Sequence, residues 1–377
     1  MPCTLGTPGQ SHLLAIAEDP NSPTKDIRMS IGTVLQGIVA RTLLKLPDSV
    51  LVRMSGGAPV VTGGRTLDAR FQFLAHQARN QPKFETLPPA LVRVGFENMG
   101  KLLDEHGRKG VSVREVGIDC APDIKLKARH YLPPNPGHAM PMIVWFHQGG
   151  CVIGSLDAAN GFCQMLADEA HVGVLSVDYR MAPENRFPAA VDDALAAFRW
   201  ARAHAGELHA DPARIAVGGD SAGGYLAATV CQGLKQAGEK QPALQLLIYP
   251  NVDATMKGGS LDIYAEAFPL TSAVMDWFYS HYLNDQKECS DWRVSPALNP
   301  DLAGLAPARI YAAGFDPLLD QGAAYAEKLK QAGVAVSYHC FDALAHAFTM
   351  MGGAISTAAT ANHRIAHETG HALRSIV

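Results

Sequence analysis

The stretch IAVGGDSAGGYLAATVCQGLKQA, residues 215–237, decides the fold of this chain. It joins a short apolar run, Ile215–Val217, to a helix-like segment through a glycine-rich turn that carries Ser221. A GxSxG motif between a strand and a helix is typical of a nucleophile elbow, which exposes its serine at the carboxyl edge of a sheet. Such a sharp turn crowds the strand against the helix, so small residues are needed at Gly219 and Gly223. We therefore predict that Ser221 is a nucleophile presented by this turn.

A glycine-rich turn between a strand and a helix can also bind a phosphate group at the helix N-terminus. Turns of that kind usually carry a Gly-Lys-Ser/Thr sequence or a GxGxxG pattern, and this stretch has neither. The elbow is therefore the favoured interpretation.

Strand-like and helix-like segments alternate on both sides of this turn from about Val111 onward. The strand-like runs are short and continuously apolar, at residues 142–146, 172–177, 215–217, 244–249 and 310–313. Helical spacing is found between them at 189–205, 223–237 and 321–332. Continuous apolar runs suit strands that are buried on both faces, as in parallel sheets. The alternation predicts an α/β fold with a mostly parallel, doubly wound sheet flanked by helices.

Residues 1–110 differ from the rest because they show helical spacing and no strong strand signal. Amphipathic helices are expected at 31–46, 71–78 and 91–103, separated by prolines and by the loop SGGAPVVTGG. We interpret 1–110 as a helical cap segment over a catalytic domain at 111–377. The aromatic-rich insert 261–284 is either core packing or a second part of this cap.

A serine hydroxyl needs a base that accepts its proton and an acid that orients the base. In this fold class the chain order is Ser, Asp or Glu, His. Asp316 follows the expected strand ARIYAAG and His346 follows VAVSYHC, so both belong at the edge where α/β sheets gather functional groups. The rival acid, Asp320, is expected on the next helix, where the helix dipole favours a carboxylate. The rival base, His339, is expected inside its strand, so Asp316 and His346 are preferred.

A loop suited to binding an oxyanion follows the apolar run 142–146. It reads HQGGC, residues 147–151, and stands where HGGG-type loops precede a nucleophile elbow. Glycines allow backbone N–H groups to approach a carbonyl oxygen without an intervening Cβ. We expect the amides of Gly149, Gly150 and Ala222 to form an oxyanion hole, with His147 and Gln148 shaping the loop.

Six ordered motifs between about residues 111 and 350 resemble the hormone-sensitive-lipase-like branch of the α/β-hydrolases, which includes many bacterial carboxylesterases. They read HQGGCVIGSLD (147–157), VDYRMAPENRFPAAVDDA (177–194), GGDSAGGYLA (218–227), SPALNPDL (295–302), GFDPLLDQG (314–322) and ALAHAF (343–348). The resemblance implies Ser221 as nucleophile, His346 as base and Asp316 as the residue that orients it. It further implies hydrolysis of small to medium carboxylic esters through an acyl-enzyme, without a cofactor. One departure is Gln148, which stands where the family usually has its first glycine.

Two other functions are compatible with parts of the sequence. Gibberellin receptors share the resemblance but bind a small molecule without a working histidine, and the complete set of Ser221, Asp316 and His346 argues against such a receptor. The segment HETGH, residues 367–371, matches the HExxH pattern of zinc hydrolases. Its spacing marks no third ligand, and Gly370 weakens the helix that would hold the pair. We therefore expect no metal site.

The composition excludes several classes of protein. Of the 377 residues, 47% are hydrophobic and 18% are charged, with a formal net charge of −4. Such a chain can bury a large core, and it lacks the basic excess of nucleic-acid-binding proteins. Seven scattered cysteines without a CxxC pair favour free thiols. With neither a secretory signal nor an apolar run of about 18 residues in view, we expect a cytoplasmic protein without a membrane span, and leave a homodimer open.

Overall fold

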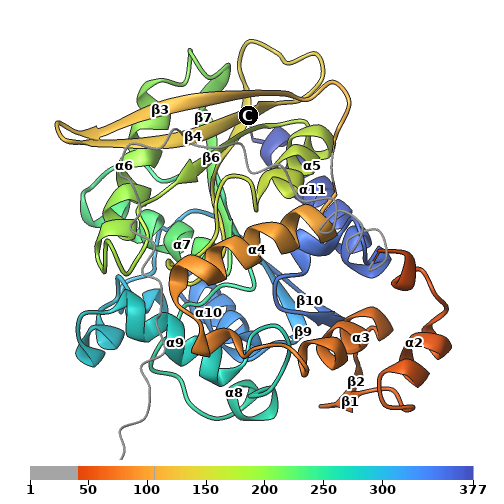
Figure 1. Ribbon diagram of the computed structural model, residues 1–377. Coiled ribbons are helices and arrows are strands. Elements are labelled where there is room, and N and C mark those ends of the chain that lie inside the picture. Colours follow the sequence, from red (N-terminus) through yellow and green to blue (C-terminus); the bar gives the residue numbers. More distant parts are fainter. Residues whose placement is uncertain (1–40, 106, 377) are drawn as a thin grey trace, which may run out of the picture.

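A computed structural model describes residues 41–105 and 107–376, and an eight-stranded sheet lies at its centre (Figure 1). The strand order is β10-β9-β8-β7-β5-β6-β4-β3, and β4 runs antiparallel to both of its neighbours while every other pair is parallel. The predicted mostly parallel sheet is therefore confirmed. Its strands are β3 (Ser112–Ala121), β4 (Ile124–Leu132), β5 (Met140–Phe146), β6 (Gly173–Asp178), β7 (Ala210–Asp220), β8 (Gln245–Ile248), β9 (Ala308–Phe315) and β10 (Val336–Ala345).

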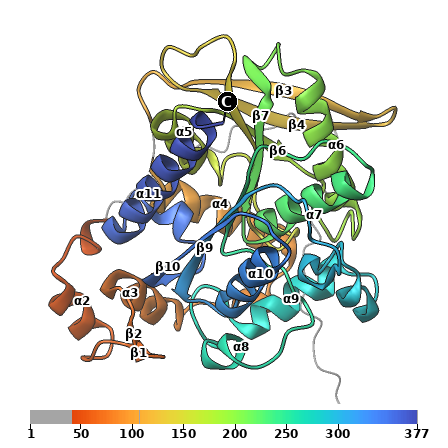
Figure 2. The same ribbon diagram turned by 180° about the vertical axis from the view of Figure 1, so that it is seen from behind.

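Helices cover both faces of this sheet, as a doubly wound fold requires (Figure 2). Two separate apolar cores fill the space between the layers. The first contains side chains of α6 (Ala189–Ala203), α7 (Ala222–Gln236) and α10 (Leu319–Gln331). The second contains side chains of α5 (Asn160–Ala170) and α11 (Ser356–Arg374). Every residue of β5 is buried, which accounts for its continuously apolar sequence.

The part of the N-terminal segment that the structure describes is mainly helical. It forms α2 (Asp48–Met54), α3 (Ala69–Ala78) and α4 (Pro89–Leu103), so the helices expected at 71–78 and 91–103 are present. Most of the helix expected at 31–46 lies outside the described residues, and residues 41–43 of it are helical. The side chain of Asp68 caps α3 by accepting a hydrogen bond from the Arg70 N–H at 2.8 Å.

The N-terminal segment also contains two short strands, for which no strong signal was seen in the sequence. A short antiparallel hairpin, β1 (Val61–Thr62) and β2 (Arg65–Thr66), turns at Gly63 and Gly64. Both glycines have a positive φ, of 59° and 76°, which suits a two-residue hairpin loop. Strands of two residues are too short to show an alternating pattern, so the glycine pair is the only local signal of this hairpin.

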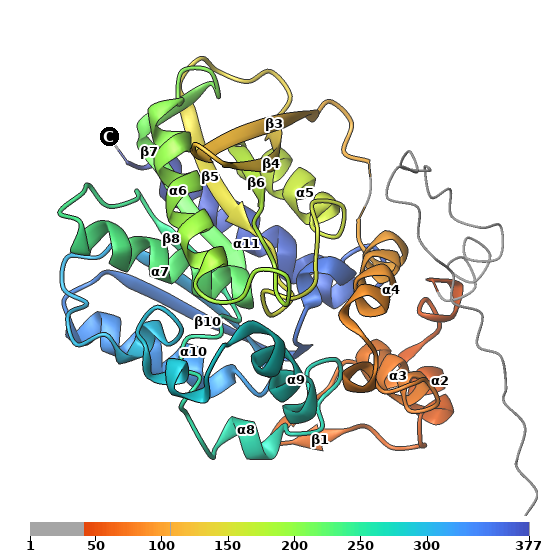
Figure 3. The same ribbon diagram turned by 60° about the vertical axis from the view of Figure 1, so that its left-hand side comes forward.

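The aromatic-rich insert lies beside the N-terminal segment, over the carboxyl end of the sheet (Figure 3). It contains α8 (Ser260–Ile263) and α9 (Ser272–Tyr282). The Phe84 ring packs edge-on against the rings of Trp277 and Phe278, with centroid distances of 5.1 and 5.6 Å. Four 3-10 helices complete the described elements: η1 (Phe84–Thr86), η2 (Gln286–Ser290), η3 (Pro296–Leu298) and η4 (Phe348–Met351).

Two further expectations concern thiols and membranes. The six cysteines in the described part of the chain are free thiols. In the described part of the chain, no helix is both long enough and apolar enough to cross a bilayer.

Candidate active site

Ser221 occupies the turn between β7 and α7, as the motif predicts. Its backbone is in a conformation that side chains rarely adopt, with φ of 54° and ψ of −116°. A Cβ at Gly223 would collide with the carbonyl oxygen of Phe146, and a Cβ at Gly219 would collide with the backbone of Gly223. The two small residues are therefore required by the close approach of helix and strand, and the turn aims the Ser221 side chain beyond the sheet edge.

Asp316 and His346 meet Ser221 at this edge. The His346 Nε2 lies 2.9 Å from the Ser221 Oγ, and the His346 Nδ1 lies 2.7 Å from the Asp316 Oδ2. Asp316 follows β9 and His346 follows β10, so three strand ends supply the three side chains. All three residues are buried. The remaining Asp316 oxygen, Oδ1, accepts a hydrogen bond from the Leu318 N–H at 2.8 Å, which fixes the carboxylate plane toward the imidazole.

The rival residues lie elsewhere. Asp320 is on the first turn of α10, where its Oδ2 accepts a hydrogen bond from the Ser260 N–H at 2.7 Å. His339 is within β10, and its Nε2 lies 3.0 Å from the Arg364 guanidinium. Neither side chain is recorded in contact with Ser221, so the structure assembles the set preferred from the sequence.

The loop after β5 turns at two glycines beside the nucleophile. Gly149 and Gly150 have φ values of 123° and 61°, and a Cβ on Gly150 would collide with the Phe278 ring. Within the described part of the chain, the N–H groups of Gly149, Gly150 and Ala222 donate no backbone hydrogen bond. All three residues line pockets that Ser221 also lines, so their amides are candidates for binding a ligand oxygen.

The side chains of His147 and Gln148 contact residues outside this loop. The Tyr179 ring stacks on the His147 ring at 4.4 Å, and its hydroxyl donates to the His147 carbonyl at 2.8 Å. Burial lowers the pKa of His147 and so favours its neutral form. The buried Gln148 side chain donates through Nε2 to the Thr349 Oγ1 at 3.5 Å. Both contacts agree with the loop-shaping role expected for these two residues.

A buried carboxylate beside the nucleophile was missed by the sequence analysis. The Asp220 Oδ2 lies within hydrogen-bond distance of the Thr349 hydroxyl, at 2.7 Å, and of the Tyr249 hydroxyl, at 3.1 Å. The two hydroxyls are also in contact with each other, so their two protons are shared among three contacts. The Tyr249 ring lies 4.6 Å from the His346 ring. Asp220 therefore connects the elbow, the end of β8 and the segment that carries His346. Its place directly before Ser221 was the only sequence signal.

We expect Asp220 to contribute to the acid limb of the pH profile. Burial raises the pKa of the Asp220 carboxyl to about 6, so this group takes up a proton as the pH falls through that value. Below about pH 6, kcat/KM of the wild type should then fall more steeply than kcat/KM of Asp220→Asn, which lacks this carboxyl. The plateau of Asp220→Asn should be roughly tenfold lower, because a buried hydrogen bond to a charge is lost. A pH series from 4.5 to 9 measures both.

Thr349→Ser is the matched control for this experiment, since it keeps the hydroxyl that donates to Asp220. Its profile should follow the wild type. An Asp220→Asn profile as steep as that of the wild type would show that the carboxyl does not titrate in the active range.

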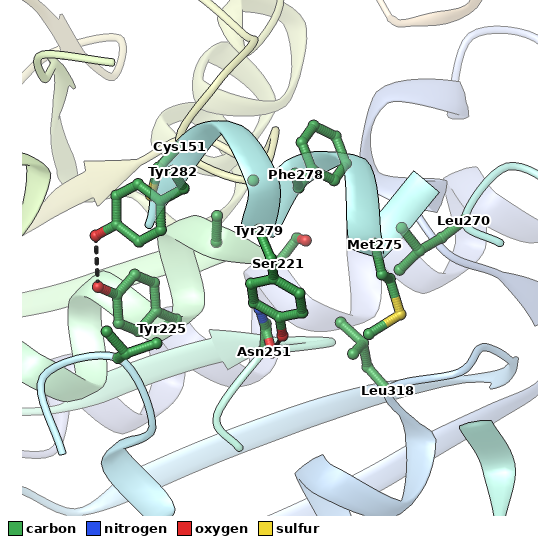
Figure 4. Close-up of a pocket in the computed structure, with 13 residues that line it drawn as sticks. Cys151, Ser221, Tyr225, Asn251, Leu270, Met275, Phe278, Tyr279, Tyr282 and Leu318 are labelled. Carbon is green, nitrogen blue, oxygen red and sulfur yellow. Dashed lines mark hydrogen bonds between the residues drawn. The ribbon is translucent and has the colours of Figure 1, made fainter. Parts of the chain in front are cut away.

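Two pockets meet at Ser221. The inner pocket, drawn in Figure 4, is lined by Gly150, Cys151, Ser221, Ala222, Tyr225, Asn251, Leu270, Met275, Phe278, Tyr279, Tyr282, Val294 and Leu318. The outer pocket lies on the other side of Phe278 and is lined by Ala78, Arg79, residues 81–85, Phe96, Met99, residues 148–150, Ile153, Ser221, Glu266, residues 268–271, Ala273, Val274, Phe278, His346 and Ala347. Its cavity volume is about 460 Å³, against about 40 Å³ for the inner pocket. The site therefore offers one small and one large compartment.

The HExxH segment is part of α11, and its residues face several different partners. The Glu368 carboxylate accepts hydrogen bonds from Tyr311 at 2.7 Å and Arg309 at 3.1 Å, which attaches α11 to β9. His367 and His371 are exposed. Across the described ranges, no group of three or more His, Cys, Asp or Glu side chains is arranged to hold a metal ion. In this structure, the segment connects α11 to the sheet through the hydrogen bonds of Glu368.

Comparison with known proteins agrees with this geometry. A family model described as the alpha/beta hydrolase fold matches residues 143–350. The carboxylic ester hydrolase LipN of Mycobacterium tuberculosis is 37% identical over 352 residues, which cover 92% of each chain. The ethyl acetate hydrolase of Pseudomonas putida is 40% identical over 270 residues, covering 71% of this chain and 85% of that protein.

Solved structures of ester hydrolases share the same fold. An ester hydrolase from the metagenome of Lake Arreo, in complex with a phosphonate derivative, matches with a TM-score of 0.78 and 35% identity, covering 88% of this chain and 99% of that one. The esterase of Pyrobaculum calidifontis matches with a TM-score of 0.73 and 33% identity, covering 80% and 96%. The chain therefore belongs to the α/β-hydrolases, in the hormone-sensitive-lipase-like branch of carboxylic ester hydrolases.

Proposed function

We propose that Ser221, His346 and Asp316 hydrolyse small carboxylic esters through an acyl-enzyme. The observation that carries this proposal is the unbroken hydrogen-bonded chain from the Ser221 Oγ through both nitrogens of His346 to Asp316. In this arrangement the imidazole can accept the hydroxyl proton at Nε2 while its Nδ1–H stays bonded to the carboxylate. The ester is a small molecule, in keeping with the ethyl acetate hydrolase among the relatives.

The reaction has two halves. In the first, Ser221 Oγ attacks the ester carbonyl as its proton passes to His346, and the amides of Gly149, Gly150 and Ala222 hold the oxygen that becomes negative. His346 then donates the proton to the departing alcohol, which leaves an acyl-serine. In the second half, water takes the place of the alcohol and gives its proton to His346, and the carboxylic acid is released. Asp316 keeps the imidazole in the required tautomer and stabilises its cation.

We also propose that the N-terminal segment 1–110 and the insert 261–284 together form the cap over the catalytic domain 111–377. The contacts of Phe84 with Trp277 and Phe278 support this division, and both segments line the outer pocket. A cytoplasmic location and a homodimer stay predictions from the sequence.

A phosphonate ester with a p-nitrophenyl leaving group tests the proposal. Such a compound should release one equivalent of p-nitrophenol, abolish esterase activity and add its phosphonyl mass to the peptide that contains Ser221. Ser221→Ala, the control, should carry no added mass. Activity should survive prolonged EDTA treatment. Mass added at another residue would exclude Ser221 as nucleophile, whereas inactivation by EDTA that zinc reverses would favour the HExxH segment. Binding of esters without turnover would favour a receptor.

A further inference from the structure

The position of His346 assigns the two halves of an ester to the two pockets. His346 lines the outer pocket and is absent from the lining of the inner pocket. If His346 donates the proton to the departing alcohol, the alcohol oxygen must lie on its side of Ser221. The alcohol group then extends into the outer pocket. The acyl group, on the opposite side of the carbonyl carbon, extends into the inner pocket.

The inner pocket suits a short hydrocarbon chain. Its volume of about 40 Å³ corresponds to roughly three water-sized groups. Its tyrosine hydroxyls are already paired, because Tyr225 and Tyr282 bond to each other at 2.7 Å and Tyr279 donates to Asn251 at 3.0 Å (Figure 4). With these polar groups satisfied, the lining favours methylene groups over polar substituents.

A further cavity lies behind one wall of the inner pocket. This side cavity, of about 150 Å³, is lined by the polar side chains of Asp253, Asp276, Gln286 and Gln321 as well as by Met275 and Tyr279. Met275 and Tyr279 line both the inner pocket and the side cavity, so they form the wall between the two. In Figure 4, the Met275 side chain lies with Leu270 and Leu318 at one end of the inner pocket.

The two wall residues are held differently. Tyr279 is held by its hydrogen bond to Asn251, which also fixes the direction of its ring. Met275 comes from α9 and packs against the small apolar cluster of Leu270, Val274 and Leu318. A methionine in such a position is an apolar, unbranched plug whose removal leaves no buried polar group without a partner.

We propose that Met275 is the residue that limits acyl-chain length, because it closes the inner pocket against the side cavity. The substrates are then esters of short, straight acyl groups with larger alcohols. This assignment rests on the proposed function, since it needs the alcohol to leave on the side of His346. Longer acyl chains are excluded by the Met275 side chain, and its removal gives them the space that the side chain fills.

A p-nitrophenyl ester series from acetate to dodecanoate, measured with Met275→Ala, tests the proposal. The wild type should favour acetyl to butanoyl groups and lose at least about tenfold in kcat/KM by octanoyl, given the cost of unaccommodated methylenes. In Met275→Ala, the ratio of octanoate to acetate activity should rise about tenfold or more. Met275→Phe should shift the preference toward acetate, because a bulkier side chain shortens the pocket.

Met256→Ala is the matched control, because Met256 lines the side cavity and not the inner pocket. Its chain-length profile should equal that of the wild type. A second series, in which acetate esters carry alcohols of increasing length, should be unaffected by Met275→Ala, since those groups occupy the outer pocket.

The possible results distinguish the proposed role of Met275 from the proposed esterase function. Active variants with an unchanged octanoate to acetate ratio would overturn the role of Met275 and leave the esterase assignment intact. A change confined to the alcohol series would reverse the assignment of the two pockets. Absence of activity on every ester in the wild type would overturn the proposed function itself.

Discussion

Ser221→Ala is expected to lower kcat by about 10⁴- to 10⁶-fold and to leave the fold intact, because no other group can accept the acyl chain. His346→Ala is expected to cost as much, since the Ser221 hydroxyl, 2.9 Å from the His346 Nε2, then has no base. The double variant should lose little more than either single variant, because the two side chains act as one unit. Initial rates on p-nitrophenyl acetate at pH 8, with circular dichroism to verify folding, measure all three.

The loss of kcat in the double variant shows whether Ser221 and His346 act as one unit. If the two single losses multiplied in the double variant, Ser221 and His346 would be acting independently, and the proton transfer between them would be excluded. A Ser221→Ala protein that kept more than about a tenth of the wild-type rate would remove the nucleophile assignment altogether.

Asp316→Asn is expected to lower kcat by about 10³- to 10⁴-fold while leaving KM nearly unchanged. The Asp316 Oδ2 accepts a hydrogen bond from the His346 Nδ1 at 2.7 Å. An amide at this position can present its NH₂ group to the ring, which favours the tautomer with a proton on Nε2 and prevents His346 from accepting the Ser221 proton. The charge that stabilises the imidazolium is also lost. Steady-state kinetics of the folded variant measure the effect.

Asp320→Asn is the matched control for this substitution. Asp320 lies four residues after Asp316, and its Oδ2 accepts a hydrogen bond from the Ser260 N–H. An amide oxygen can also accept this bond, so the kcat of Asp320→Asn should stay within about twofold of the wild-type value. A severe loss in Asp320→Asn and a mild loss in Asp316→Asn would transfer the orienting role to Asp320.

The sequence was most informative where one short segment determines its own geometry. The elbow follows from steric crowding among Gly219, Ser221 and Gly223, which act within five residues. The positions of Asp316 and His346 follow from a general property of parallel sheets, since strand ends converge at one edge. For that reason the fold class could be predicted, and the three side chains chosen from the sequence are those that the structure brings together.

Features that depend on distant contacts could not be predicted. The hydrogen bonds of Asp220 reach Tyr249 and Thr349, which are 29 and 129 residues away, and no local pattern connects them. Gly150 needs its small size because Phe278 lies against it, a contact between two segments that no spacing relates. The wall formed by Met275 likewise depends on how α9 packs over the sheet edge, which hydrophobic periodicity does not specify.

The backbone conformation of Ser221 affects which substitutions would stabilise this protein. A residue with a side chain at φ 54° destabilises the native state by roughly 1–2 kcal/mol relative to glycine. Ser221→Gly would therefore relieve conformational strain and abolish the hydroxyl in one substitution. At this position, stability and activity therefore favour different residues, and selection for thermostability at residue 221 alone would lead away from catalysis. Activity is retained only while selection acts on the reaction itself.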